Sequence, residues 1–306
     1  MKILSEADVR EGLDPSAVIV AIENGFRERL SSVVLPARTH MDVENGIFLI
    51  MPCYDRAGHG LGIKLVTVQD TPAHPEARIQ ATYLLLDSAT GAPTLILSAN
   101  YLTDVRTAAT SAVATKFLAR DAVRTLGIFG TGRQARAHAR VLPRVRKFEK
   151  ILVCGRTPEH VRRFTDEVSA ESGLPVQPVS AQDCAAGSDV ICACTASATP
   201  VFDGHLLKAG THLNLVGAFQ PHTREVDSVT IRRSRVTVET YDGVLAEAGD
   251  LLIPMGEGVL TRAGIVAELQ ELVTGKKAGR TSTGDLTLFK SVGCALEDLV
   301  TAELLA

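Results

Sequence analysis

The stretch TLGIFGTGRQA, residues 125–135, limits the possible folds of this chain more than any other segment. An apolar run leads into a glycine turn, and helix-forming residues follow at once. Gly130 permits a tight turn, Gly132 lets the backbone approach a ligand, and Ala135 lets the helix pack close to the strand. We therefore predict a turn whose backbone N–H groups bind the pyrophosphate of a dinucleotide. The residues expected to hold it are Gly130, Thr131, Gly132, Arg133 and Gln134.

The second apolar run, residues 150–155, begins about one helix later, as a β-α-β unit requires. NAD-binding sites of this kind usually carry an Asp or Glu about 20 residues after the glycines. This chain has Gly155, Arg156 and Thr157 there instead. A guanidinium and a hydroxyl suit a 2′-phosphate, so we expect Arg156 and Thr157 to favour NADP(H) over NAD(H). The alternative is that Arg156 stacks on the adenine.

Strands and helices alternate from about residue 122 onward, which is typical of a doubly wound parallel sheet of the Rossmann type. The first hundred residues differ, because a helix that starts at Asp14 and Pro15 is followed by strand-like runs with turns between them. Thr103 is expected to cap a helix over 104–120. The expected strands are 46–51, 61–68, 78–87, 93–98, 125–130, 150–155, 176–179, 189–194, 211–216 and 235–239.

Apolar residues recur at helical spacing over 287–303, and this pattern predicts an amphipathic helix that docks on the N-terminal part of the chain. We therefore expect a discontinuous α+β domain, residues 1–118 plus 287–306. The Rossmann domain, residues 119–286, is inserted into it. The fold class is α/β.

Composition excludes several classes of function. A formal net charge of −3 and the lack of a basic run with interleaved aromatic residues argue against nucleic-acid binding. The N-terminus becomes charged too early for a signal peptide, and no apolar stretch is long enough to cross a membrane. The cysteines and histidines lack the spacing of a metal site. We expect a metal-free cytoplasmic protein whose cysteines stay reduced.

Lys64 is the sharpest candidate for chemistry outside the glycine turn. In a strand it shares one face with Gly62, Val66 and Val68, so its ammonium group emerges among apolar or small side chains. A charge there needs a partner, such as a substrate carboxylate, or an unusual pKa. The alternative is a lysine on an edge strand that reaches water.

Two arginines are further candidates. Arg38 follows a proline that fixes the local chain, and Arg106 lies in the first turn of the helix expected from Thr103. A cation at a helix N-terminus is unfavourable unless it contacts an anion. Each could instead be an ordinary arginine in solvent.

An ordered series of segments resembles the ornithine cyclodeaminase/mu-crystallin family, and the likeness covers nearly the whole chain. The matching segments are PAR at 36–38, MP at 51–52, GIKLV at 62–66, LD with TG at 86–91, RTAATS at 106–111, GTGRQA at 130–135, NLVGA with P and RE at 214–225, EAGD at 247–250, and LFKSVG with ED at 288–298.

The resemblance implies a homodimer whose α+β domain binds a small imino or amino acid and forms the dimer interface. It implies that Lys64, Arg38 and Arg106 are catalytic, with the two arginines clamping the substrate carboxylate. It places Thr195, Asn214 and Val216 at the cofactor. The substrate pocket that it implies contains Met51, Arg78, Phe219 and Ser291.

Three departures bear on the reaction. Phe219 stands where ornithine cyclodeaminase has an Asp, and a phenyl ring cannot act as an acid or base. Arg78 replaces a Thr, and Arg156 replaces the acid that binds NAD. We therefore expect an NAD(P)H-dependent reductase of α-imino acids, such as Δ1-pyrroline-2-carboxylate or Δ1-piperideine-2-carboxylate. The alternatives are ornithine cyclodeaminase, reductive amination as in alanine dehydrogenase, and a non-catalytic NADP-binding protein.

Overall fold

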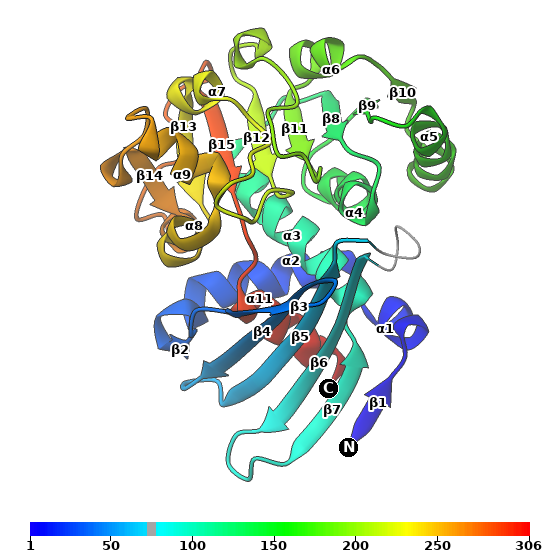
Figure 1. The fold of residues 1–306 in the computed structure, drawn as a ribbon, viewed down its shortest axis with the longest axis vertical. Helices are drawn as coiled ribbons and strands as arrows, with labels where there is room; N and C mark the ends of the chain where they lie inside the picture. The colour runs from blue at the N-terminus through cyan, green and yellow to red at the C-terminus, as the bar shows by residue number, and fades with distance from the viewer. Residues whose placement is uncertain (72–77) are drawn as a thin grey trace. The chain divides into compact units, whose positions relative to one another are not determined.

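The computed structural model describes residues 1–71 and 78–306. The chain divides into two compact units (Figure 1). Unit 1 comprises Met1–Thr110 and Cys294–Ala306, and unit 2 comprises Ser111–Gly293. The sequence had placed the boundaries at 118/119 and 286/287. They differ because one helix runs through the first boundary and a central strand lies just before the second.

Unit 1 contains a mostly antiparallel sheet with the strand order β1-β7-β6-β5-β4-β2, and β3 also pairs with β4. Among the strands of the described residues, only β1 runs parallel to its neighbour, β7. The strands are β1 (Lys2–Leu4), β2 (Val33–Val34), β3 (Thr39–Val43), β4 (Gly46–Asp55), β5 (Gly60–Gln69), β6 (Ile79–Asp87) and β7 (Pro93–Ser98). The four strands expected in this region all occur, with slightly different ends.

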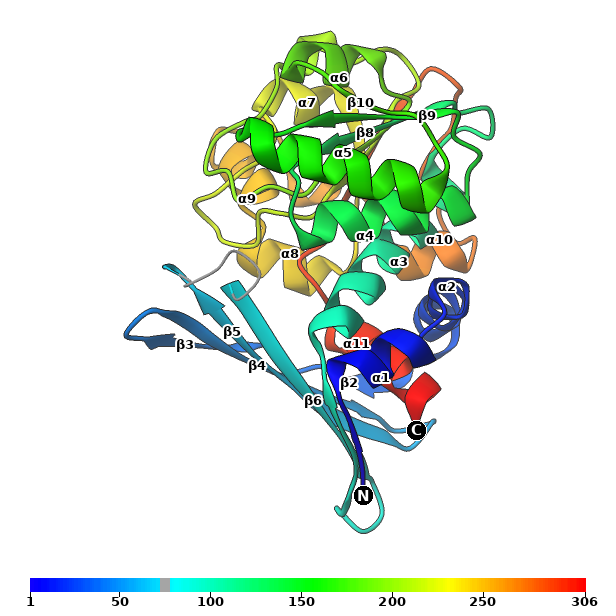
Figure 2. The same cartoon turned by 90° about the vertical axis from the view of Figure 1, so that its right-hand side faces the viewer.

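The central strand β5 alternates strictly between buried and half-buried residues. Its buried face carries Gly62, Lys64, Val66 and Val68, as the sequence predicted. Helices α1 (Glu6–Gly12), α2 (Pro15–Asn24) and α11 (Ala295–Ala302) lie on one side of the sheet, and α11 packs directly on β4, β5 and β6 (Figure 2). The lysine is therefore covered by a helix from the other end of the chain.

Helix α2 begins as the sequence predicted. The side chain of Asp14 accepts a hydrogen bond from the backbone N of Ala17 at 3.2 Å, and Pro15 occupies the first helical position. The helix continues into a π-helical turn, Gly25–Arg29, and a 3-10 turn, Leu30–Ser32.

Helix α3 (Asn100–Leu118) starts earlier than expected. Thr103 already donates its backbone N–H to the carbonyl of Ala99, so it lies inside the helix and is not its cap. Asn100 follows β7 almost directly, and its side chain is anchored by the backbone N of Ala81 at 2.8 Å. Arg106 consequently lies beyond the first turn, and the expected clash with the helix dipole was wrong.

Unit 2 contains a parallel sheet with the order β10-β9-β8-β11-β12-β15-β13-β14. The strand order reverses between β8 and β11, which is the arrangement of a doubly wound fold. The strands are β8 (Thr125–Phe129), β9 (Lys150–Cys154), β10 (Val176–Pro178), β11 (Val190–Ala193), β12 (His212–Leu215), β13 (Ser234–Val238), β14 (Ile265–Glu268) and β15 (Leu286–Lys290). The Rossmann prediction is confirmed.

The helix expected over 287–303 is wrong for its first half. Residues Leu286–Lys290 form β15, which lies between β12 and β13 (Figure 1), and only Ala295–Ala302 is helical. Every residue of β15 is buried, so its sequence lacks the alternation that marks a half-exposed strand. The apolar residues of the strand and of the helix that follows it happen to fall at helical spacing, so the pattern over 287–303 was wrongly interpreted as one helix.

The sheet of unit 2 is connected mainly by helices, and these are α4 (Arg133–Val141), α5 (Pro158–Ser172), α6 (Ala181–Gly187), α7 (Ser228–Arg233), α8 (Tyr241–Glu247), α9 (Gly249–Gly256) and α10 (Leu269–Val273). Among the described residues, every helix is too short or too polar to span a bilayer. Within the same ranges, no group of three or more His, Cys, Asp or Glu side chains is arranged to hold a metal ion.

Candidate functional site

The glycine turn after β8 has the geometry that the sequence predicted. Gly130 adopts a φ of 104°, and a Cβ there would lie 2.6 Å from the carbonyl oxygen of Cys194. Only glycine fits such a position. Gly132 is exposed, and a Cβ on it would meet no atom within 4 Å. Open space therefore lies beside the backbone at Gly132, as a ligand that binds through backbone N–H groups requires.

Helix α4 begins at this turn with Gly132 as its N-cap, and the cap provides no side-chain hydrogen bond to the first turn. Arg133 and Gln134 are the first two helical residues, and Ala135 is fully buried against the sheet. The first-turn N–H groups and the helix dipole favour a bound anion. These residues fit the pyrophosphate of a dinucleotide.

Arg136 stabilises the same turn, and sequence reasoning did not identify it. Its guanidinium donates to the carbonyl oxygen of Thr131 at 2.5 Å and, through Nε, to Glu167 at 2.6 Å. Its position in the sequence could have identified it, because an arginine in the first turn of a helix is unusual unless it has an acceptor nearby.

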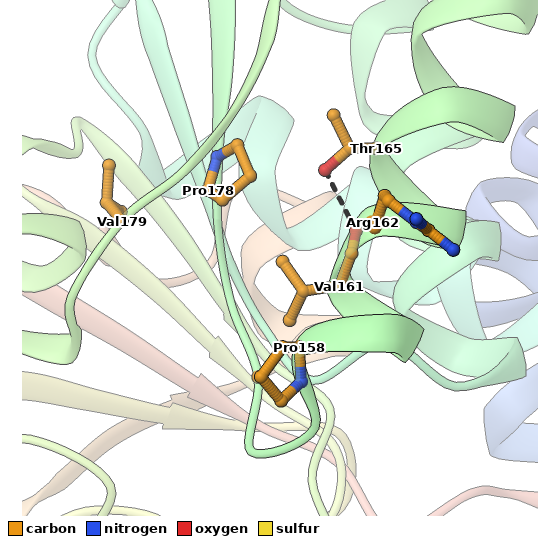
Figure 3. Close-up of a pocket in the computed structure, with 7 residues that line it drawn as sticks. Pro158, Val161, Arg162, Thr165, Pro178 and Val179 are labelled. Carbon is orange, nitrogen blue, oxygen red and sulfur yellow. Dashed lines mark hydrogen bonds between the residues drawn. The ribbon is translucent and has the colours of Figure 1, made fainter.

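At the carboxyl end of β9, Arg156 and Thr157 are exposed, and Thr157 is the N-cap of α5 without a side-chain cap bond. A cavity of about 310 Å³ lies beside them, between α5 and β10 (Figure 3). Its lining is mostly apolar and consists of Gly155, Pro158, Val161, Arg162, Thr165, Pro178 and Val179. No acid stands among residues 155–157, and the nearest acid along the chain is the exposed Glu159 in the first turn of α5.

The strand ends on the other side of the switch point carry Thr195, Asn214 and Val216. Thr195 and Val216 are half-buried, one after β11 and the other after β12. Asn214 is fully buried, and its amide nitrogen donates to Thr115 Oγ1 at 3.0 Å, while His212 Nε2 lies 3.3 Å from its amide oxygen. The side chain of Asn214 is thus bonded within unit 2.

The buried face of the unit 1 sheet holds a cluster of four charges, Lys64, Arg106, Glu297 and Asp298. Lys64 Nζ donates to Asp298 Oδ1 at 2.8 Å, and Arg106 Nε lies 2.9 Å from the same oxygen. A second Arg106 nitrogen, NH1, donates to Glu297 Oε2 at 2.6 Å. β5, α3 and α11 each contribute to this cluster, which we call the buried ion cluster.

Burial of the cluster alters the proton affinity of Lys64, which is 1% exposed. Burial, together with the adjacent Arg106 guanidinium, lowers the pKa of Lys64 from its ordinary value of 10.5 to about 8. Asp298 and Glu297 oppose the shift. The edge-strand alternative for Lys64 is therefore wrong, because β5 is central and its lysine has buried partners.

The other predicted residues are distributed between the units. Met51 is buried directly opposite Lys64 in the β4–β5 ladder, and Arg38 is half-buried between β2 and β3. Arg78 is exposed just before β6. Phe219, half-buried, and Ser291, buried, belong to unit 2. Glu297 and Asp298 lie in one of the matching segments, but no role was predicted for them, although two acids on a buried face of a helix require partners.

The parallel sheet, its switch point and the open glycine turn define a dinucleotide-binding protein of the Rossmann type. The chain belongs to the ornithine cyclodeaminase/mu-crystallin family, which it matches over residues 1–306. This confirms the resemblance found in the sequence.

Named relatives support a more detailed comparison. The chain is 36% identical to a Δ1-pyrroline-2-carboxylate reductase of Bacillus cereus, covering 100% of this chain and 95% of the relative. It is 33% identical to the ketimine reductase mu-crystallin of Rattus norvegicus, covering 98% and 95%. Its fold matches the Thermococcus litoralis Δ1-pyrroline-2-carboxylate reductase, solved with NADH and L-proline, with a TM-score of 0.95 at 38% identity over 99% and 96% of the two chains.

The pKa of Lys64 predicts how stability depends on pH. Below pH 8 the lysine is protonated in both the folded and the unfolded protein. Between about 8 and 10.5 the folded protein has released a proton that the unfolded chain still holds. The free energy of unfolding should therefore rise with pH over this window, by on the order of 3 kcal/mol.

Urea unfolding of the wild type and Lys64→Met at pH values from 7 to 10.5 checks this expectation, because the difference between the two proteins isolates the lysine. Lys116→Met, which changes an exposed lysine on α3, should follow the wild type. Parallel stability curves for the wild type and Lys64→Met would contradict the prediction.

Proposed function

We propose that this chain is an NAD(P)H-dependent reductase of α-imino acids, with Δ1-pyrroline-2-carboxylate and Δ1-piperideine-2-carboxylate as the candidate substrates. The main support is the convergence of two buried cations, Lys64 and Arg106, on one carboxylate oxygen of Asp298. Relatives named as reductases of such imines cover the whole chain. The open glycine turn provides for the cofactor.

Charge balance explains how the substrate carboxylate is bound in this proposal. Glu297 and Asp298 neutralise Lys64 and Arg106, which makes the burial of all four charges tolerable. Arg38 is the residue that we propose to bind the substrate carboxylate. Arginine suits this role because its planar fork pairs with a carboxylate through two bonds. Positioning of this kind can lower the barrier by several kcal/mol.

The reduced nicotinamide, when bound, supplies the hydride. The protein's own contribution is to orient the imine and to keep its nitrogen protonated. Lys64 Nζ is our candidate for the donor of the proton on the imine nitrogen. A pKa of about 8 lets this amine both hold and release a proton near neutral pH. Met51, opposite Lys64 in the sheet, gives the candidate pocket an apolar wall.

Phe219 favours reduction over cyclodeamination. Its ring occupies the position of the cyclodeaminase Asp and offers no acid or base for losing ammonia. Arg78, exposed before β6, places a cation where the cyclodeaminase pattern has a Thr. Ser291, a buried residue of unit 2 that directly follows β15, stays a candidate for substrate binding through its hydroxyl group.

Assays with purified protein test the proposal. NADPH or NADH oxidation should accompany addition of either cyclic imine, whereas L-ornithine should release no ammonia. Lys64→Met should lower kcat by about 100-fold or more, since general acid catalysis of this kind contributes that much. It should still bind NADPH, because the glycine turn lies in unit 2.

Lys116→Met is the matched control and should retain wild-type turnover. Three results would each contradict the proposal: ammonia release from ornithine, reduction only of pyruvate with ammonia, or unchanged turnover in Lys64→Met.

We further propose that NADP(H) is preferred over NAD(H). Arg156 and Thr157 are exposed at the end of β9, and no acid occupies residues 155–157 to bind a ribose 2′-hydroxyl. The guanidinium pairs with the 2′-phosphate, and the α5 N-terminus adds a favourable dipole. The Thermococcus relative was solved with NADH, so the preference is a property to measure in this chain.

Arg156→Ala should raise KM for NADPH by about 10-fold or more and leave KM for NADH within about 2-fold, because only the phosphate contact is lost. Steady-state kinetics with both cofactors measure this. Arg124→Ala removes an exposed arginine at the opposite edge of the sheet and should change neither value. Equal effects on both cofactors would argue for adenine stacking.

We also propose a homodimer formed through the uncovered face of the unit 1 sheet. The described helices of unit 1 lie on one side of the sheet (Figure 2). Half-buried apolar residues point to the other side. Ile63, Leu84 and Ile96 form a row across β5, β6 and β7, with Leu65 and Ile50 beside it. A contiguous apolar face of this kind marks an interface.

Leu65→Asp should convert the dimer to a monomer, because it buries a charge in the proposed interface. Light scattering after size-exclusion chromatography gives the mass directly. Val20→Asp, at a 58% exposed apolar residue on α2, should leave the dimer intact. A monomeric wild type would contradict this assignment.

The cysteines bear on the compartment. All of them, Cys53, Cys154, Cys184, Cys192, Cys194 and Cys294, are free thiols. Free thiols suit a reducing compartment, and we propose the cytoplasm.

A further inference from the structure

Glu225 is a fully buried acid in unit 2 that none of the roles above explains. It lies in the loop between β12 and α7 and accepts three hydrogen bonds, two from the loop after β11 and one from the start of its own loop. One oxygen, Oε1, accepts from the backbone N of Thr195 at 2.6 Å and from its Oγ1 at 2.8 Å. The other, Oε2, accepts from the backbone N of Gly217 at 2.7 Å. The carboxylate therefore bridges the ends of β11 and β12.

The two loops are in close contact where Glu225 joins them. A Cβ on Gly217 would lie 2.0 Å from the carbonyl oxygen of Thr195 and 2.7 Å from Glu225 Oε1. Neither loop can move far without moving the other. The Glu225 carboxylate thus links the backbone at Thr195 to the backbone at Gly217.

A second layer of charges fixes Glu225. Asp250 Oδ1 accepts hydrogen bonds from the backbone N of Glu225 at 2.7 Å and of Val226 at 3.2 Å. Lys290, the last residue of β15, pairs with Asp250 Oδ2 at 2.9 Å and donates to the carbonyl oxygen of Ala218 at 2.5 Å. Both side chains are fully buried. The network therefore joins the carboxyl ends of three adjacent strands, β11, β12 and β15.

These strand ends lie on the side of the switch point away from β9. In a doubly wound sheet the dinucleotide crosses the carboxyl edge at the switch point, with its adenosine half over the first strands. The other half, which carries the nicotinamide, then lies over β11 and β12. We propose that Glu225 is a positioning residue that holds the backbone at Thr195 and Gly217 in place for the nicotinamide half of the cofactor.

This inference rests on the dinucleotide site of the proposed function. It does not depend on which imine the protein reduces. Glu225→Gln tests it. An amide can accept on only one side, so its NH2 group faces either the Thr195 or the Gly217 N–H and that bond is lost. The other loop stays attached, and the volume of the side chain is unchanged.

The measurement compares two ligands. The affinity for NADPH, measured by nicotinamide fluorescence, should weaken by about 10-fold or more, because a buried donor is left unpaired beneath the ligand. Binding of 2′,5′-ADP, followed by calorimetry, should change by less than about 2-fold, because this fragment lacks the nicotinamide half. A merely structural role would affect both ligands equally or neither.

Asp189→Asn is the matched control. Asp189 Oδ2 accepts the backbone N–H groups of Arg124 at 2.8 Å and of Thr125 at 3.0 Å, so it too joins segments, but at the amino edge of the sheet. The variant should lower the thermal midpoint without changing either affinity. If Glu225→Gln fails to fold, Glu225→Asp keeps the charge but is too short to reach both loops, and the same selective loss is expected.

The outcomes separate the two proposals. Unchanged NADPH affinity in the Glu225 variants, or an equal loss for both ligands, would overturn the positioning role. A wild type that binds NADPH but reduces no imine would overturn the proposed reaction and leave the role of Glu225 supported by the selective loss. A wild type that binds neither NADPH nor NADH would overturn both.

Discussion

Unit 1 depends on the pairing of Lys64 and Arg106 with Asp298 and Glu297. Charges this deeply buried are tolerable only when their partners are in place, and loss of one partner typically costs about 3–5 kcal/mol. The buried ion cluster therefore fixes α11 against β5 and α3 with a defined register. An apolar core would be as stable, but it would not present ammonium and guanidinium groups at fixed positions. We regard this placement as the reason that the charges are buried.

Unit 2 uses the same principle for its backbone. The strand ends that face a dinucleotide need N–H groups in fixed positions, and loops alone fix them poorly. Gly130 does so through its conformation, Arg136 by bonding the carbonyl of Thr131, and Glu225 by accepting N–H groups from two loops. Burial and the nearby Asp250 charge raise the pKa of Glu225, while Lys290 and Thr195 oppose this. The backbone N–H groups are thus held in place by a carboxylate whose burial beside Asp250 is electrostatically unfavourable.

Local patterns predicted much of this structure. The glycine turn, the start of α2 and the alternation in β5 are each encoded within a few neighbouring residues, and all were predicted from sequence. The start of α3 was missed because the Asn100 side chain accepts a hydrogen bond from the backbone N–H of Ala81, which lies on β6 and is distant in sequence. Strand β15 was missed because both its faces are buried, which removes the alternation. The partners of Lys64 were missed because no local pattern links a strand to acids more than two hundred residues away.

That separation also constrains the order of folding. The cations of the buried ion cluster lie before unit 2 in the chain, and both acids follow it. Until α11 reaches the sheet, Lys64 has no carboxylate partner on a face that must become buried, so the central part of unit 1 cannot be completed early. Unit 2 is continuous in sequence and needs no such contact. Because contacts between distant residues form slowly, we expect closure of α11 over β5 to be a late step in the folding of unit 1.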